Sequence, residues 1–85
     1  MRQVIDLARW LGWRCWHNTI AYRSGAGWPD LFMVRGNRAV AAELKTMKGT
    51  VSPAQQGWLD ALILTGIETH VWRPDQWSAV ERILS

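Results

Sequence analysis

The chain has 85 residues, the length of one small domain, and its single cysteine excludes an internal disulfide and a cysteine-rich zinc site. No apolar run approaches the roughly 20 residues that a membrane-spanning helix needs, and no leading segment resembles a signal peptide, so we expect a cytoplasmic protein. The formal net charge of +3 suits a polyanionic partner, but an excess of this size is also common in proteins with other partners.

Large apolar side chains are abundant for so short a chain. Hydrophobic residues make up 48% of the sequence, and seven residues are tryptophan. A domain of this size buries only around 60% of the surface that its unfolded chain exposes. We expect most of the tryptophans to pack in the core and the remaining apolar surface to be covered in a homodimer.

The first half of the chain predicts one helix and three strands. Apolar residues at helical spacing predict a helix over 2–11, and Cys15, at the centre of a short alternating strand over 13–17, is expected in the core. A loop over 18–28 follows. Two apolar runs, 30–35 and 38–46, flank the turn signal Gly36-Asn37, so they predict a β-hairpin.

The second half predicts a helix, a strand and a last helix. A loop over 47–51 leads to Ser52 and Pro53, which suit the N-cap and first position of a helix ending near Gly66. A strand over 67–73 follows, and Pro74 ends it and begins a helix over 74–84. The side chains expected to face the core are Trp58, Leu59, Leu62 and Ile63 on the first of these helices and Trp77, Val80 and Leu84 on the second.

Two acids and a lysine lie on this predicted hairpin. Asp30 begins the first strand, and Glu43 and Lys45 lie two residues apart near the end of the second, so their side chains point to one face. Antiparallel pairing places the start of one strand beside the end of the other, which brings all three together. Each fragment alone is a common surface pattern, whereas their order, spacing and apolar surroundings together favour a site.

Two converging carboxylates repel each other unless a cation lies between them. Their hard oxygen ligands suit Mg²⁺ or Mn²⁺, which polarises a phosphate and offsets charge that develops on it. Lys45 could orient or deprotonate an attacking water, or stabilise the developing anion. The residue types therefore indicate hydrolysis of a phosphodiester bond.

Motifs along nearly the whole chain resemble the VRR-NUC domain, a branch of the PD-(D/E)xK nuclease superfamily, in the short form found in phages and bacteria. They are Trp16-His17, Arg23-Ser24, Gly27-Trp28-Pro29-Asp30-Leu31, Ala42-Glu43-Leu44-Lys45-Thr46, Ser52-Pro53-Ala54-Gln55 and Trp58-Leu59. The resemblance implies a single α/β domain over 1–85 with a restriction-endonuclease-like αβββαβα core, a mixed sheet flanked by helices. It also implies a metal-dependent DNA endonuclease selective for branched substrates such as four-way (Holliday) junctions.

Position by position, the resemblance makes Asp30 and Glu43 metal ligands, with the Leu44 carbonyl as a third, and makes Lys45 the active-site lysine. Gln55 matches a glutamine that supports catalysis, and it can equally close a capping box with Ser52.

Basic, small and aromatic residues near these motifs are candidates for binding DNA. The basic ones neutralise phosphates, with solvated surface arginines as the alternative, and Trp28 could stack on an unpaired base. The candidates are Arg23, Ser24, Trp28, Arg35, Arg38 and Lys48.

The chain departs from the family pattern in its first helix, where many members carry a glutamate that completes the acidic cluster. Asp6 is the only acid in this segment, which begins Met1-Arg2-Gln3. Asp6 could substitute, the third acid could lie upstream, or the site could function with two acids. The departure keeps two alternatives open: a DNA-junction-binding module with weak or lost catalysis, and a nuclease subunit of a larger assembly.

Overall fold

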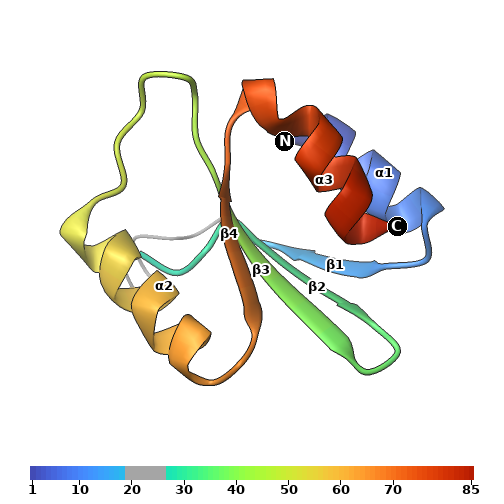
Figure 1. Ribbon diagram of the computed structural model, residues 1–85, viewed down its shortest axis with the longest axis horizontal. Coiled ribbons are helices and arrows are strands. Elements are labelled where there is room, and N and C mark those ends of the chain that lie inside the picture. Colours follow the sequence, from blue (N-terminus) through green and yellow to red (C-terminus); the bar gives the residue numbers. More distant parts are fainter. Residues whose placement is uncertain (19–26) are drawn as a thin grey trace.

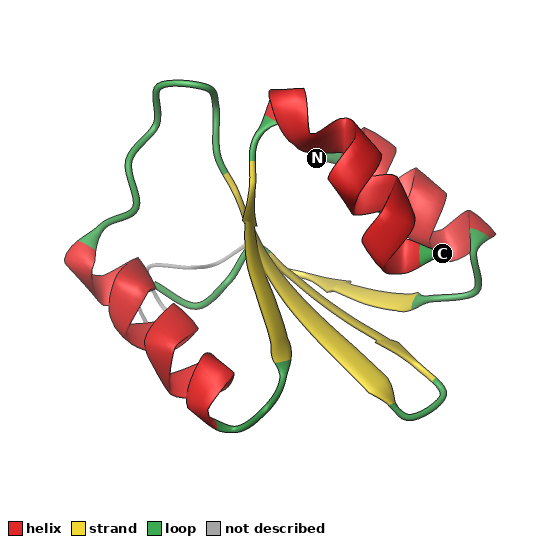
Figure 2. Cartoon of the chain, viewed as in Figure 1, coloured by secondary structure: helices red, strands yellow, loops and turns green. Residues whose placement is uncertain are grey.

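The computed structural model describes residues 1–18 and 27–85, and it places helices on both faces of a four-stranded sheet (Figures 1 and 2). The predicted αβββαβα order is confirmed, and a short 3₁₀ turn begins the segment predicted as the last helix. The elements are α1 (Arg2–Trp10), β1 (Arg14–His17), β2 (Leu31–Arg35), β3 (Arg38–Leu44), α2 (Pro53–Leu64), β4 (Glu68–Trp72), η1 (Pro74–Gln76) and α3 (Trp77–Leu84). None of these helices is long and apolar enough to cross a membrane.

The sheet has the order β1-β2-β3-β4 and is mixed. The first three strands pair antiparallel, and the predicted hairpin joins β2 to β3 with Leu31 opposite Ala42. β4 pairs parallel to β3, which requires a crossover connection, and α2 provides it. The carboxyl ends of β3 and β4 therefore lie side by side, next to the start of β2.

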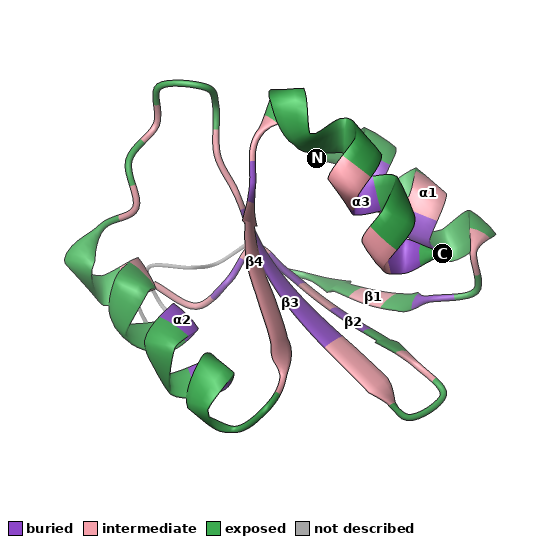
Figure 3. Cartoon of the chain, in the orientation of Figure 1, coloured by how far each residue is buried: buried purple, intermediate pink, exposed green. Residues whose placement is uncertain are grey.

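The main core lies between one face of the sheet and the pair α1 and α3 (Figure 3). Trp13 is buried in it, and its indole nitrogen donates a hydrogen bond to the Leu84 carbonyl at 2.8 Å, which ties the start of β1 to the end of α3. Cys15 is half-buried beside this core, and burial raises the pKa of its thiol. α2 covers the opposite face near β4 and buries Leu59 and Leu62.

The expectation that most tryptophans are packed inside is wrong. Only Trp13 and Trp72 are buried, and Trp10 is 87% exposed. Trp77 and Ile63, predicted to face the core, are 38% and 55% exposed, and Trp58 is 40% exposed. A domain this small has too little interior for seven indoles, so much of the aromatic surface remains at the solvent.

Arg35 and Arg38 flank the turn between β2 and β3, at the opposite end of these strands from Asp30 and Glu43. The Arg35 guanidinium donates to the carbonyls of Leu11, Leu84 and Ser85, each at 3.0 Å. Arg38 forms an ion pair with Glu68, with bonds of 2.7 and 2.8 Å, and also donates to the Ile83 carbonyl. Both guanidinium groups also lie over the Trp13 ring. These two arginines therefore hold the hairpin to the C-terminal helix, and the fold places them at the far end of the hairpin from the two acids. Their binding to DNA stays a prediction.

Candidate active site

Asp30 and Glu43 hold each other in place across the β2–β3 hairpin. Asp30 directly precedes β2, and its carboxylate Oδ2 accepts a hydrogen bond from the Leu44 N–H at 2.8 Å. In return, Glu43 Oε1 accepts from the Asp30 N–H at 3.2 Å. Each carboxylate thus binds the backbone beside the other with one oxygen, and the proximity expected from the sequence is present in the fold.

The second Glu43 oxygen is buried without a hydrogen-bond partner. The Glu43 side chain is 1% exposed, and its Oε2 is fully covered. Burial first, and then the neighbouring Asp30 carboxylate, raise the pKa of Glu43 from 4.5 to about 7, although Lys45 acts in the opposite direction. A further cation beside this carboxylate would lower its pKa and favour the ionised form at neutral pH.

Lys45 follows β3 directly and lies beside this carboxylate. Its ammonium Nζ is 3.5 Å from Glu43 Oε2, an ion-pair distance that is longer than a good hydrogen bond, and its side chain is 18% exposed. The Lys45 N–H donates to the Trp72 carbonyl at 3.0 Å, so β4 fixes the backbone at this point. The ammonium therefore lies between a buried acid and the solvent.

The donor set fits a hard divalent cation. Asp30 and Glu43 each have one carboxylate oxygen that accepts no hydrogen bond from the backbone, so both oxygens remain as possible metal ligands. Within residues 1–18 and 27–85, no group of three His, Cys, Asp or Glu side chains could hold a metal ion together. Asp6, which is exposed on α1, therefore does not complete the pair. The Leu44 carbonyl stays a predicted third ligand.

The Gly27–Asp30 segment is fixed from two sides. Asn18 is buried and directly follows β1. Its backbone N–H donates a hydrogen bond to the Asp30 carbonyl at 2.9 Å, and its side-chain amide donates to the Trp28 carbonyl at 3.2 Å. On the other side, Gly27 has φ +91° and packs against the backbone of Ala54 at the start of α2, with no room for a Cβ. Asn18 was missed as a positioning residue, and its only sequence signal is a polar residue directly after a strand.

Gln55 closes a capping box at the start of α2, which confirms one of its two predicted roles. Its side-chain oxygen accepts from the Ser52 N–H at 2.9 Å, and its own N–H donates to the Ser52 hydroxyl at 3.1 Å. Its support of catalysis stays a prediction. The close approach of Gly27 to Ala54 and Gln55 places this helix start against the segment that carries Asp30.

The predicted DNA-binding residues are distributed unevenly around the acids. Lys48 is exposed in the loop that follows β3. Trp28 is half-buried and packs with Phe32 at 6.0 Å and Trp58 at 5.0 Å between ring centroids, so it lies within an aromatic cluster. Arg23 and Ser24 lie outside the described residues. Of the basic candidates that the structure describes, Lys48 therefore lies nearest to Lys45 along the chain.

Arg73 is a residue near the site that the sequence analysis did not select. It follows β4, and its guanidinium donates to the carbonyls of Thr46 and Gly49, each at 2.7 Å, which anchors the loop carrying Lys48. The signal was its position directly after a strand. Parallel pairing of that strand with β3 would have placed it beside Lys45, because parallel strands end on the same side of a sheet.

Comparison with known proteins identifies the fold. No protein-family model matches the chain, and no curated protein matches it. A solved structure described as "VRR_NUC domain protein" superposes on it with a TM-score of 0.69 at 20% sequence identity, and the match covers 99% of this chain and 88% of the other. The fold of this chain is thus that of a VRR-NUC domain, as its motifs led us to expect.

Proposed function

We propose that this chain is a metal-dependent endonuclease that hydrolyses phosphodiester bonds in DNA. The observation that carries the proposal is the reciprocal pair of Asp30 and Glu43 with the Lys45 ammonium 3.5 Å from the Glu43 carboxylate. Asp30 directly precedes the hairpin, and Glu43 and Lys45 lie at its end. All three lie together where β3 and β4 terminate. The likeness to a VRR_NUC domain protein supports the same chemistry.

Asp30, Glu43 and the Leu44 carbonyl would hold Mg²⁺ or Mn²⁺. The ion, when bound, polarises the phosphate and makes a water a stronger nucleophile. Lys45 then presents a fixed positive charge to the phosphate oxygens on the solvent side of the acids. Its contribution is orientation or activation of the water, or stabilisation of the anion that develops at phosphorus.

For the substrate and assembly, we propose branched DNA, such as a four-way junction, cut by a homodimer. The sequence motifs support the branch preference. Two apolar side chains exposed on the sheet face opposite α1 and α3, Trp16 and Val34, support association of two copies. A two-fold dimer places two sites in the symmetry that a two-fold junction presents.

Cleavage of labelled linear duplex and four-way junction with Mg²⁺, Mn²⁺ or EDTA tests the proposal. Cutting should need metal and should be lost in Asp30→Asn and Lys45→Ala, whereas Glu81→Gln, which changes an exposed acid on α3, should retain it. Equal cutting of both substrates would contradict the branch preference. Cutting in EDTA would contradict the metal dependence. Binding without cutting would contradict the nuclease and support a DNA-binding module instead.

A further inference from the structure

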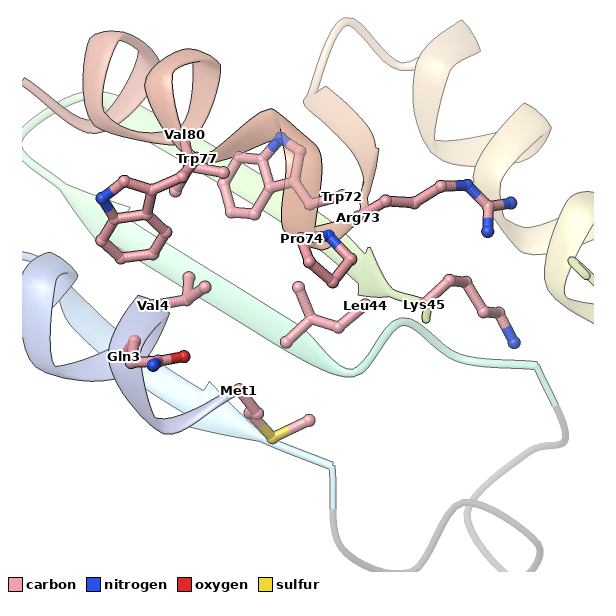
Figure 4. A pocket seen from close by; sticks show the side chains of 10 residues that line it. All are labelled: Met1, Gln3, Val4, Leu44, Lys45, Trp72, Arg73, Pro74, Trp77 and Val80. Carbon is pink, nitrogen blue, oxygen red and sulfur yellow. The ribbon is translucent and has the colours of Figure 1, made fainter. Parts of the chain in front are cut away.

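A pocket of about 560 Å³ lies beside the proposed catalytic centre, between the start of α1, the ends of β3 and β4, and the start of α3 (Figure 4). Leu44 and Lys45 form part of its wall. The same Leu44 donates its N–H to Asp30, and the same Lys45 lies beside Glu43. Asp30 and Glu43 do not line the pocket, but Leu44 and Lys45 place it next to the acid pair.

The walls of the pocket divide into an aromatic part and a cationic part. Trp72 and Trp77 lie at one end with aliphatic side chains, and Lys45 and Arg73 lie at the other end with their charged groups pointing outward (Figure 4). The lining contains no acid, so nothing in it repels an anion. Arg73 is held by two carbonyl oxygens at 2.7 Å, which fixes its positive charge at this place. Aromatic walls beside two cations are complementary to a nucleotide, which joins a flat base to a phosphate.

The size of the pocket determines whether a duplex or a single nucleotide could enter it. Pockets for small ligands occupy about 300 to 1,000 Å³, so this volume suits a single nucleotide and excludes a duplex. A base within a duplex is stacked and paired and has to leave the stack before it can enter such a pocket. Trp77, which is 38% exposed, offers an accessible aromatic side chain for the displaced base.

We propose that this pocket binds one unstacked nucleobase of the DNA strand, next to the phosphate that Lys45 contacts. This inference rests on the proposed function and adds the feature that would select the DNA substrate. Trp77 stacks on the base, and Lys45 and Arg73 contact the adjoining phosphates. Strands that are single, frayed or mismatched at this position bind better than paired strands, because their bases are already free.

Binding in EDTA, measured by fluorescence anisotropy, tests the pocket without depending on cleavage. The probes are a labelled short thymidine oligomer and an oligomer of the same length built from abasic units, which has the same charge. Stacking of a base on an aromatic side chain predicts at least about fivefold tighter binding of the thymidine oligomer to the wild-type chain. Equal binding of the two oligomers, or binding of neither, would overturn the proposal.

Three substitutions test whether Trp77 causes the tighter binding of the thymidine oligomer. Trp77→Leu, which keeps an apolar side chain without an aromatic face, should bring the two affinities close together, and Trp77→Phe should restore most of the difference. Trp10→Leu is the matched control, because Trp10 is 87% exposed on α1 and does not line the pocket. A preference retained in Trp77→Leu would overturn the proposal even if the protein cuts DNA.

Photo-crosslinking of the wild-type chain gives a second test that requires no folded variant. A thymidine oligomer with one 5-iodouracil should crosslink to Trp77 or to another pocket residue, as located by mass spectrometry of the peptides. Crosslinks confined to Trp16, Trp28 or Trp58, which lie away from the pocket, would overturn the proposal. A crosslink at Trp77 in a protein that cuts no DNA would support the pocket and contradict the nuclease, so the two failures are distinct.

Discussion

Glu43 makes the stability of the metal-free protein depend on pH. Its pKa is about 7 in the folded chain, first because of burial and then because of Asp30, against an ordinary value of 4.5. Between these values the folded state holds a proton that the unfolded state has lost. The free energy of unfolding from this group therefore falls as pH rises through the window and stays lower above it. Melting temperatures in EDTA should decrease from about pH 5 to about pH 8.

The substitution Glu43→Gln separates stability from function at this position. At pH about 8 in EDTA it should raise the free energy of unfolding by roughly 1 to 3 kcal/mol, because it removes a buried charge, and it should have little effect near pH 5. Glu81→Gln, at an exposed acid, should change neither value. Glu43→Gln should also abolish metal-dependent cutting. Melting curves that show the same stability difference at both pH values would contradict this account.

Substitution of Lys45 should affect the rate of cutting, whereas substitution of Lys48 should affect DNA binding, although both lysines lie in one short segment. Lys45→Ala removes the charge beside the acids and should lower the rate of cutting by about 100-fold or more while DNA still binds. Lys48→Ala removes an exposed charge and should weaken DNA binding. It should lower the salt dependence of the binding constant by about one phosphate contact and leave the cutting rate at saturating protein unchanged. Single-turnover cleavage and salt titrations measure both. Equal losses of rate in the two variants would contradict the assignment of Lys45.

At the scale of elements, the contact between the Gly27 backbone and α2 positions Asp30. A Cβ on Gly27 would lie 2.4 Å from the Ala54 carbonyl, and φ is +91°, so Gly27→Ala has to displace either the helix start or the segment before β2. We expect a loss of about 2 to 4 kcal/mol in stability, with reduced metal binding. Gly36→Ala is the matched control: φ is +60° with open space around it, so about 1 kcal/mol should be lost and metal binding retained. Denaturant unfolding and calorimetric Mn²⁺ titration distinguish the two.

The sequence predicted local relations well and relations between distant segments poorly. The hairpin was predictable because Gly36-Asn37 separates two apolar runs, and antiparallel pairing alone brings Asp30 to Glu43. The parallel pairing of β4 with β3 is a long-range contact, so the position of Arg73 beside Lys45 was not apparent. The structural role of Arg35 was not apparent for the same reason, because its partners lie at the end of α3 and directly after α1.

At the scale of the whole molecule, apolar side chains are exposed beside Arg14 on the sheet face opposite α1 and α3. Trp16 on β1 is 49% exposed and pairs with Phe32, and Val34 on β2 is 37% exposed. These side chains point away from α1 and α3, because the neighbouring Met33 packs in the core on the other side of the sheet. Burial of these side chains against a second copy would remove them from water, and β1 is an edge strand of the sheet within residues 1–18 and 27–85.

We therefore expect the wild-type chain to sediment as a dimer and Trp16→Lys to sediment as a monomer with an unchanged circular-dichroism spectrum. Trp10→Lys is the control, because Trp10 is even more exposed but lies on α1, which packs on the opposite side of the sheet. Light scattering coupled to gel filtration measures the mass. If a dimer cuts both strands of a four-way junction in one encounter, the Trp16→Lys monomer should release singly nicked junctions first. A monomeric wild type, or a dimer that survives Trp16→Lys, would show that this face is not the interface.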